Sequence, residues 1–255
     1  MALAFDGVND EGSAANAFSG LTGDTRSWAA WVNYRSQPAG TEIIEYLAEA
    51  VPAVENSEFG ISARVPVTAG WRIAISSGHG TTPGLWTYAV DLSLNTWYHI
   101  CLTYDQALTT NDAVIYVDGV AVSVTESATP NGALPGGMDS TSVGFRNSAN
   151  YGDFIIAERA WWSVILTAAD ALILSKAVCP KVVVPASMEH YDSFRDASSP
   201  SIEEILAQGL TISGATKADH PRIIYPHGPI NQKLLRKIPS SRAVGSMMSQ
   251  VSNTW

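Results

Sequence analysis

The 255-residue sequence contains only two cysteines, Cys101 and Cys179, and no Asn-X-Ser/Thr acceptor site for N-linked glycans. Two cysteines this far apart cannot build the dense disulfide framework of small secreted domains. We therefore expect both to be buried thiols. The absence of glycan acceptors agrees with a bacterial or viral origin.

Long apolar runs are also absent. No stretch approaches the ~20 apolar residues that a membrane-spanning helix needs, and the N-terminus has neither the basic segment nor the apolar segment of a signal peptide. We expect a protein that is made and folded in the cytoplasm and has no membrane partner. With 20 glycines and 13 prolines for turns, the sequence suits one domain of many short strands.

Basic residues are scarce in most of the chain. Residues 1–216 carry 9 basic and 23 acidic side chains, a net charge of −14, whereas residues 217–255 carry 6 basic and 1 acidic, a net charge of +5. An acidic body repels nucleic acid and anionic membranes, so we expect neither as a partner. The basic tail is suited to an acidic protein surface.

Metal and phosphate motifs are missing as well. The histidines, His79, His99, His190, His220 and His227, show no zinc-ligand spacing. The paired glycines near residues 78–80 and 136–137 are not followed by the helix start of a phosphate-binding loop. We expect no cofactor, apart from the calcium option considered below.

Alternating strands are the clearest feature that the sequence does contain. In residues 95–122, NTWYHICLTYD and AVIYVDGVAV are separated by the turn-rich QALTTND. Alternate residues of the first strand share one face: Ile100, Leu102 and Tyr104. Asp118 and Gly119 then form a tight hairpin turn.

This stretch, with LAFDGVND at residues 3–10, SWAAWVNYRS at 27–36 and IIAERAWWSVILTAADALIL at 155–174, resembles the concanavalin-A-like jelly-roll family. The resemblance is to laminin-G-like domains of the type found in bacteriophage virion proteins. It spans about residues 3–226 and implies an all-β fold, a two-sheet antiparallel sandwich with one short helix and an extended C-terminal arm. A fold hosts many functions, so the resemblance alone does not define a site.

Two segments depart from the strand pattern. Glu42, Glu45 and Glu49 recur at helical spacing before Pro52, so we expect residues 41–57 to form a helical or irregular insertion. Thr167 lies three residues before Asp170, which predicts a capped short helix over residues 167–176. In the family that the chain resembles, an acidic residue and a strand that ends in an aromatic residue precede a Leu-Thr or Leu-Ser pair that opens a short helix. The residues that match this pattern are Glu158, Trp162, Leu166 and Thr167.

Several residues are candidates for contact with a partner or ligand. Family members usually have smaller apolar residues at the positions of Arg159 and Trp161, so these two are a candidate surface contact, with local core repacking as the alternative. Trp86 and Tyr88 share one strand face and are a candidate sugar-stacking pair. Calcium-dependent relatives cluster acidic and amide residues at the rim of the sandwich. The residues that could approach one another at this rim are Asp6, Asn9, Asp10, Asn150 and Asp153. Because they have no recognisable ligand spacing, we assign no metal ligand.

Residues 227–255 have no counterpart in the sandwich and combine basic with apolar side chains. A terminus of this composition is disordered by default, and it can also pack on its own sandwich. We favour a partner-binding arm on a neighbouring subunit. Its candidate contact residues are Lys233, Leu234, Leu235, Arg236, Lys237, Ile238, Met247, Met248 and Trp255.

Catalytic residues are not apparent. Glycosidases with this sandwich carry Glu and Asp at alternating positions of one strand, so that both face the sugar. Glu55 and Glu58 fall in the expected insertion, while Glu189 and Asp192 face opposite sides of a strand. We therefore predict no catalytic residue and no enzymatic activity.

These observations favour a non-enzymatic virion protein, a bacteriophage capsid-decorating or cementing subunit. Its arm would dock on other virion proteins, namely the major capsid protein or neighbouring copies in a homo-oligomer, and its location would be the virion. The alternative is a carbohydrate-binding or host-attachment module of a phage tail or bacterial surface, with a glycan as partner. A third hypothesis, a glycan-degrading enzyme, requires an unrecognised carboxylate pair.

Overall fold

The computed structural model describes the chain in these ranges: 2–15, 18, 21, 23–38, 40–48, 58–64, 72–89, 92–132, 138, 140–146, 150–194 and 209–225. The chain divides into two units, residues 1–224 and 225–255. The arm at 227–255, with all of its candidate contact residues, lies outside the described residues. The fold below is that of the first unit.

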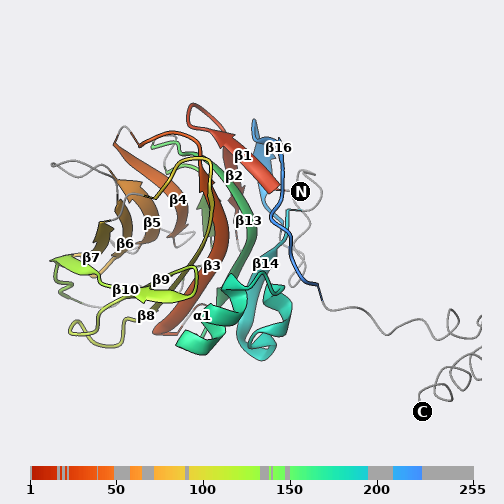
Figure 1. The fold of residues 1–255 in the computed structure, drawn as a ribbon. Helices are drawn as coiled ribbons and strands as arrows, with labels where there is room; N and C mark the ends of the chain where they lie inside the picture. The colour runs from red at the N-terminus through yellow and green to blue at the C-terminus, as the bar shows by residue number, and fades with distance from the viewer. Residues whose placement is uncertain are drawn as a thin grey trace, which may run out of the picture. The chain divides into compact units, whose positions relative to one another are not determined.

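Alternating strands assemble into two antiparallel sheets (Figure 1). The first has the order β10-β9-β8-β3-β13-β1-β16, and β14 also pairs with β13. Its strands are β1 (Ala2–Asp6), β3 (Thr25–Tyr34), β8 (Trp97–Asp105), β9 (Val114–Val117), β10 (Val120–Val122), β13 (Asp153–Trp162), β14 (Met188–Asp192) and β16 (Thr216–Ala218).

The second sheet has the order β11-β7-β6-β5-β4-β12-β2-β15. Its strands are β2 (Glu11–Ala14), β4 (Thr41–Ala48), β5 (Glu58–Arg64), β6 (Arg72–Ser77), β7 (Gly84–Ala89), β11 (Thr125–Ala128), β12 (Ser140–Val143) and β15 (Thr211–Ser213). The predicted fold class, an all-β two-sheet sandwich, is confirmed.

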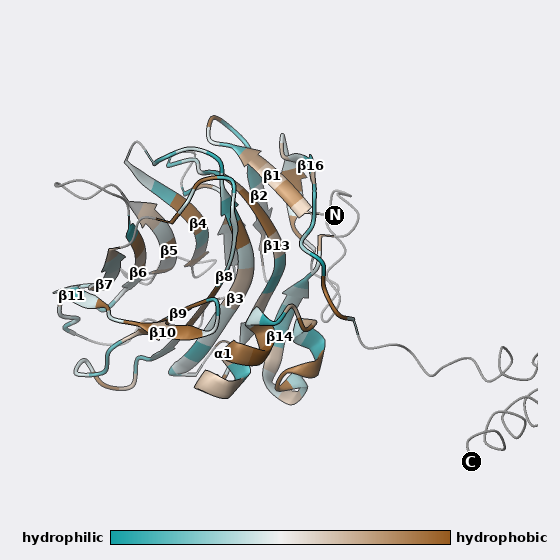
Figure 2. Ribbon diagram, in the orientation of Figure 1, coloured by the Kyte–Doolittle hydropathy of each residue, from teal (hydrophilic) through white to brown (hydrophobic). Residues whose placement is uncertain are grey.

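The core lies between the two sheets. The predicted inward face of β8 is confirmed, since Ile100, Leu102 and Tyr104 are buried in one apolar cluster with residues of both sheets. Rings also meet across the sheets. The Phe59 ring on β5 lies 5.9 Å from that of Trp161 on β13 in an edge-to-face arrangement. Figure 2 shows hydrophobic and hydrophilic residues interleaved along the strands, as a two-layer sandwich requires.

Residues 41–48 correct the expectation of an insertion, because they form strand β4 rather than a helical or irregular loop. This strand pairs with β5 on one side and β12 on the other. Its pairing with β5 shifts register between Ile43 and Glu45, which interrupts the period-two pattern in the sequence. Glu45 is fully buried. The rest of the expected insertion, residues 49–57, lies outside the described residues.

A tight turn and a short helix lie against each other on the first sheet. Asp118 and Gly119 connect β9 to β10 with φ angles of +50° and +81°, as the predicted hairpin requires. A Cβ atom at Gly119 would lie 2.8 Å from the Cα of Leu172, so the approach of the helix also requires glycine. Helix α1 (Ala168–Ser175) begins after Thr167, whose hydroxyl accepts from the backbone N–H of Asp170. It packs against β8, β9 and β10.

Short 3-10 turns at Pro180–Val182 and Pro185–Ser187 connect α1 to β14. Cys101 and Cys179 are both buried thiols that form no disulfide, as predicted. Burial raises the pKa of the Cys101 thiol well above its ordinary value. Among the described residues, no helix has the length and apolar character needed to cross a membrane.

Candidate functional site

A buried ion pair joins the two sheets through the middle of the core. Arg159 on β13 and Glu45 on β4 are both 0 % exposed. The Nε atom of Arg159 donates to both carboxylate oxygens of Glu45 at 2.7 Å, and its Nη2 atom donates to Oε1 as well. The predicted surface contact at Arg159 and Trp161 is therefore corrected, because Trp161 is also fully buried.

Neutral donors complete the shell around the Glu45 carboxylate. The indole N–H groups of Trp28 and Trp161 donate to it at 2.7 and 2.8 Å, and the Thr141 hydroxyl donates at 2.9 Å. A buried charge is tolerated when it is paired and its remaining lone pairs accept hydrogen bonds. This centre is closed to solvent, so it cannot reach a ligand.

The candidate sugar-stacking pair is corrected for a similar reason. Trp86 is 0 % exposed, and its ring lies 4.7 Å from that of Tyr104 in the core. Tyr88 shares the inward face of β7 and is partly buried against the same core cluster. The side of the strand that looked exposed in the sequence faces the first sheet. A sugar cannot stack on the Trp86 ring in this position.

The proposed calcium rim is held together by hydrogen bonds within the protein. Asp6 accepts from the backbone N–H groups of Val8 and Asn9, and the first of these bonds is the main reason that the pKa of Asp6 is lowered. Asp10 accepts from the Asp6 N–H at 2.8 Å, and burial raises its pKa. Asp153 pairs with Arg35 at 2.7 Å. Within the described ranges, no group of three or more His, Cys, Asp or Glu residues could hold a metal ion.

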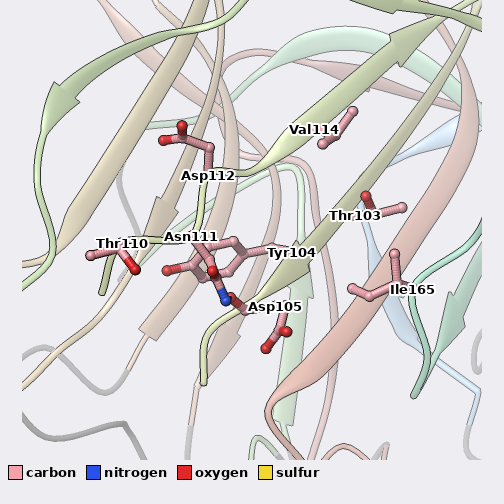
Figure 3. Close-up of a pocket in the computed structure, with 8 residues that line it drawn as sticks. All are labelled: Thr103, Tyr104, Asp105, Thr110, Asn111, Asp112, Val114 and Ile165. Carbon is pink, nitrogen blue, oxygen red and sulfur yellow. The ribbon is translucent and has the colours of Figure 1, made fainter. Parts of the chain in front are cut away.

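An open hollow lies where β8 and β9 meet the loop before α1 (Figure 3). Its volume is about 420 Å³. Strand β8, the loop after it, β9 and the loop before α1 supply the lining: Thr103, Tyr104, Asp105, Thr110, Asn111, Asp112, Val114 and Ile165. The lining combines hydroxyl, amide and carboxylate groups with two aliphatic side chains.

Two carboxylates in this hollow are fixed by one oxygen each. Asp105 Oδ1 accepts from the backbone N–H of Ala107 at 3.0 Å. Asp112 Oδ1 accepts from the indole N–H of Trp86 at 2.8 Å. The amide of Asn111 donates to the Asp105 carbonyl at 3.1 Å, which ties the loop back to β8. In the part of the chain that the structure describes, the second oxygen of each carboxylate has no hydrogen-bond donor.

Thr103 gives the hollow a polar group at its base. Its side chain is 3 % exposed and lies on the lining between the two strands (Figure 3). Its hydroxyl makes no hydrogen bond to another described residue. Thr103 Oγ1 is not one of the fully buried atoms that lack a partner, so it is open to the hollow and can bond a molecule that enters.

The apolar wall of the hollow is anchored from β3. Ile165 is 41 % exposed and faces the hollow with Val114. The Ser27 hydroxyl donates to the Val164 carbonyl at 2.7 Å and accepts from the Leu166 N–H at 2.9 Å. These bonds fix the loop that presents Ile165. The hollow thus offers polar groups and an aliphatic surface at fixed positions.

Negative charge dominates near the hollow. Burial raises the pKa of Tyr104 to about 12; Arg26 opposes this rise, and the nearby carboxylates of Asp105, Glu126 and Asp112 add to it. None of the lining side chains is basic.

The sequence reasoning did not identify this hollow. It treated QALTTND as a turn, although the turn holds three polar lining residues: Thr110, Asn111 and Asp112. The signal available was the concentration of Asp, Asn and Thr next to a strand. Ile165 is far from this turn in sequence, so only the fold brings the two segments together.

Two facing antiparallel sheets define a β-sandwich protein. Residues 6–171 match the family described as the concanavalin A-like lectin/glucanases superfamily, and the chain belongs to this family.

Solved structures show the same fold at low sequence identity. A heptameric SAP-like pentraxin from Limulus polyphemus is 12 % identical, with a TM-score of 0.55, over 83 % of this chain and 93 % of that one. A putative carbohydrate binding protein from Bacteroides ovatus ATCC 8483 is 19 % identical, with a TM-score of 0.57, over 84 % of this chain and 58 % of that one. A comparison with curated proteins gives no match.

Proposed function

We propose that the protein is a non-enzymatic carbohydrate-binding domain and that the hollow beside β8 and β9 receives the glycan. The observation that carries the proposal is the unpartnered Thr103 hydroxyl beside two carboxylates and an aliphatic wall. A sugar ring has hydroxyl groups around its edge and C–H groups on its faces. The mixed lining of the hollow suits both.

Family membership and fold support the same proposal. The Bacteroides ovatus protein, which shares the fold, is named a putative carbohydrate binding protein. Each of the two carboxylates holds a backbone N–H or an indole N–H through one oxygen and keeps the other for a ligand.

The substitution Thr103→Val tests the site. It removes one hydroxyl and keeps the branched shape, so glycan affinity should fall about 2- to 10-fold, the equivalent of one hydrogen bond. A glycan array supplies the ligand, and isothermal titration measures the change in Kd. Thr211→Val, on an exposed strand of the other sheet, is the matched control and should bind normally. Glycan hydrolysis by the wild type, or unchanged affinity of Thr103→Val, would contradict the proposal.

A second candidate function is a bacteriophage capsid-decorating subunit whose arm docks on the major capsid protein or on neighbouring copies. The charge asymmetry favours it, because residues 1–216 carry a net charge of −14 and residues 217–255 a net charge of +5. A basic arm is attracted to an acidic surface such as that of a second copy. Repetition over a shell would turn a modest contact into avidity.

Deletion of residues 227–255 tests this second function. The truncated protein should keep the circular dichroism spectrum of a folded sandwich and lose co-sedimentation with intact phage particles. A full-length variant in which Lys233, Arg236 and Lys237 are changed to Glu should also lose it, because the docking charge is reversed. Stoichiometric incorporation of the truncated protein would rule the arm out as the attachment device.

A further inference from the structure

The charge and geometry of the hollow indicate which class of sugar it would bind. We propose that it selects sugars that carry a free, protonated amine, that is, hexosamine units, over N-acetylated and acidic sugars. This inference rests on the proposed function, because it names the class of glycan for the same site.

The first basis is the unmatched negative charge. Asp105 and Asp112 both line the hollow, and none of the lining residues is Lys, Arg or His. Each carboxylate has one oxygen engaged by the protein and a second oxygen without a donor among the described residues. A carboxylate oxygen without a donor favours a donor that also carries positive charge.

The second basis is the Thr103 hydroxyl, which is independent of the acidic residues. Thr103 as a whole residue is 3 % exposed, and its hydroxyl is open to the hollow and has no partner in the described part of the chain. Figure 3 shows it across the hollow from Asp112, with Asp105 at the lower edge. A ligand that bonds this hydroxyl is therefore held within the field of both carboxylates.

An ammonium group fits this arrangement better than a hydroxyl or an acetamide. It offers three N–H donors and no acceptor, so it can bond carboxylate oxygens with charge assistance. Acetylation removes the charge and adds bulk. A uronic or sialic acid brings a carboxylate toward Asp105 and Asp112, and like charges repel at this range. The aliphatic side chains of Val114 and Ile165 remain available to the C–H face of any sugar.

The experiment titrates the full-length protein with oligosaccharides of one length: a glucosamine oligomer, its N-acetylated form and a galacturonic acid oligomer. We expect the glucosamine oligomer to bind at least tenfold more tightly than its acetylated form, as one charge-assisted hydrogen bond permits. Binding of the acid should be undetectable. The preference should weaken with added salt and disappear at a pH where the sugar amine is neutral.

Variants that remove one negative charge test whether the glucosamine preference comes from the two carboxylates. Asp105→Asn and Asp112→Asn keep Oδ1 as an acceptor for Ala107 and Trp86, so the hollow should keep its shape. Each should reduce the glucosamine preference about 3- to 10-fold, because one of two attracting charges is lost. Asp219→Asn changes the same net charge at an exposed position after β16, on the far edge of the sheet, and should leave the preference unchanged.

The outcomes separate this inference from the proposed function. Equal affinity for the glucosamine and N-acetylated oligomers overturns the amine preference and leaves glycan binding intact. No binding of any sugar overturns both. A peptide with the sequence of residues 233–237, Lys-Leu-Leu-Arg-Lys, is titrated in parallel. If it binds as tightly as the glucosamine oligomer with the same Asp105 and Asp112 dependence, the hollow is a cationic peptide site and the amine-sugar proposal fails.

Discussion

Glu45→Gln should lower the free energy of unfolding by about 3–5 kcal/mol, the usual cost of removing one partner of a buried ion pair. The amide has one carbonyl oxygen where the carboxylate has two, so it can accept from only one of the Trp28 and Trp161 indoles. The Arg159 guanidinium also remains 0 % exposed with no opposing charge. Arg159→Met should cost a similar amount, because it leaves the carboxylate uncompensated. Urea denaturation followed by tryptophan fluorescence measures both losses.

The double variant Glu45→Gln/Arg159→Met separates charge pairing from packing. It should be more stable than either single variant, because both buried charges are gone and only one indole N–H loses its acceptor. Glu126→Gln, on the exposed strand β11, is the control and should change stability by less than about 0.5 kcal/mol. Additive losses in the double variant would show that Glu45 and Arg159 are not coupled.

The strand framework could be predicted from the sequence because it depends on local signals. Alternation in β8 and the Asp118–Gly119 turn are visible within a few residues. The capping bond between Thr167 and Asp170 is equally local. Each of these features depends on residues that are close together in the sequence, so it can be predicted without knowing which strands pair.

The same reasoning failed where distant residues decide the outcome. Glu45 indicated a solvated helix or loop, yet Arg159, more than a hundred residues later, neutralises it inside a strand. Arg159 indicated a surface contact because the family that the chain resembles usually has a smaller apolar residue there, and its pairing with Glu45 is visible only in the fold. Sequence patterns do not encode which charges meet, so both errors have one cause.

Trp86 shows a related limit. Period-two alternation correctly placed Trp86 and Tyr88 on one face of a strand, but it does not say which face meets the core. The pairing of β7 in the second sheet turns that face toward Tyr104. The hollow depends on the same kind of information, since Asp112 is held by Trp86 and Ile165 comes from the loop before α1.

Acidification should destabilise the protein through His99 before most carboxylates are protonated. The imidazole is 2 % exposed beside the Trp31 ring, 5.4 Å away, and its Nδ1 atom has no hydrogen-bond partner among the described residues. Burial lowers the pKa of His99 from 6.5 to about 3. The unfolded chain therefore binds a proton near pH 6.5, while the folded protein does not.

The sign of the pH dependence follows from this difference. Above pH 6.5 His99 is neutral in both states and contributes no pH dependence; as pH falls toward 3, protonation increasingly favours the unfolded state. At about 1.36 kcal/mol for each pKa unit, the loss between pH 6.5 and pH 4 is about 3 kcal/mol from this residue alone. Burial also lowers the pKa of His79, which acts in the same direction.

His99→Phe provides the test, because phenylalanine keeps a ring beside Trp31 and cannot titrate. The free energy of unfolding, measured in urea from pH 7.5 to pH 4, should fall less steeply for the variant than for the wild type, by about 3 kcal/mol over the range. His99→Phe and His79→Phe together should flatten the curve further. If the wild type and His99→Phe lose stability in parallel over this range, His99 takes up a proton in the folded protein as readily as in the unfolded chain. That result would exclude a buried, neutral imidazole at position 99.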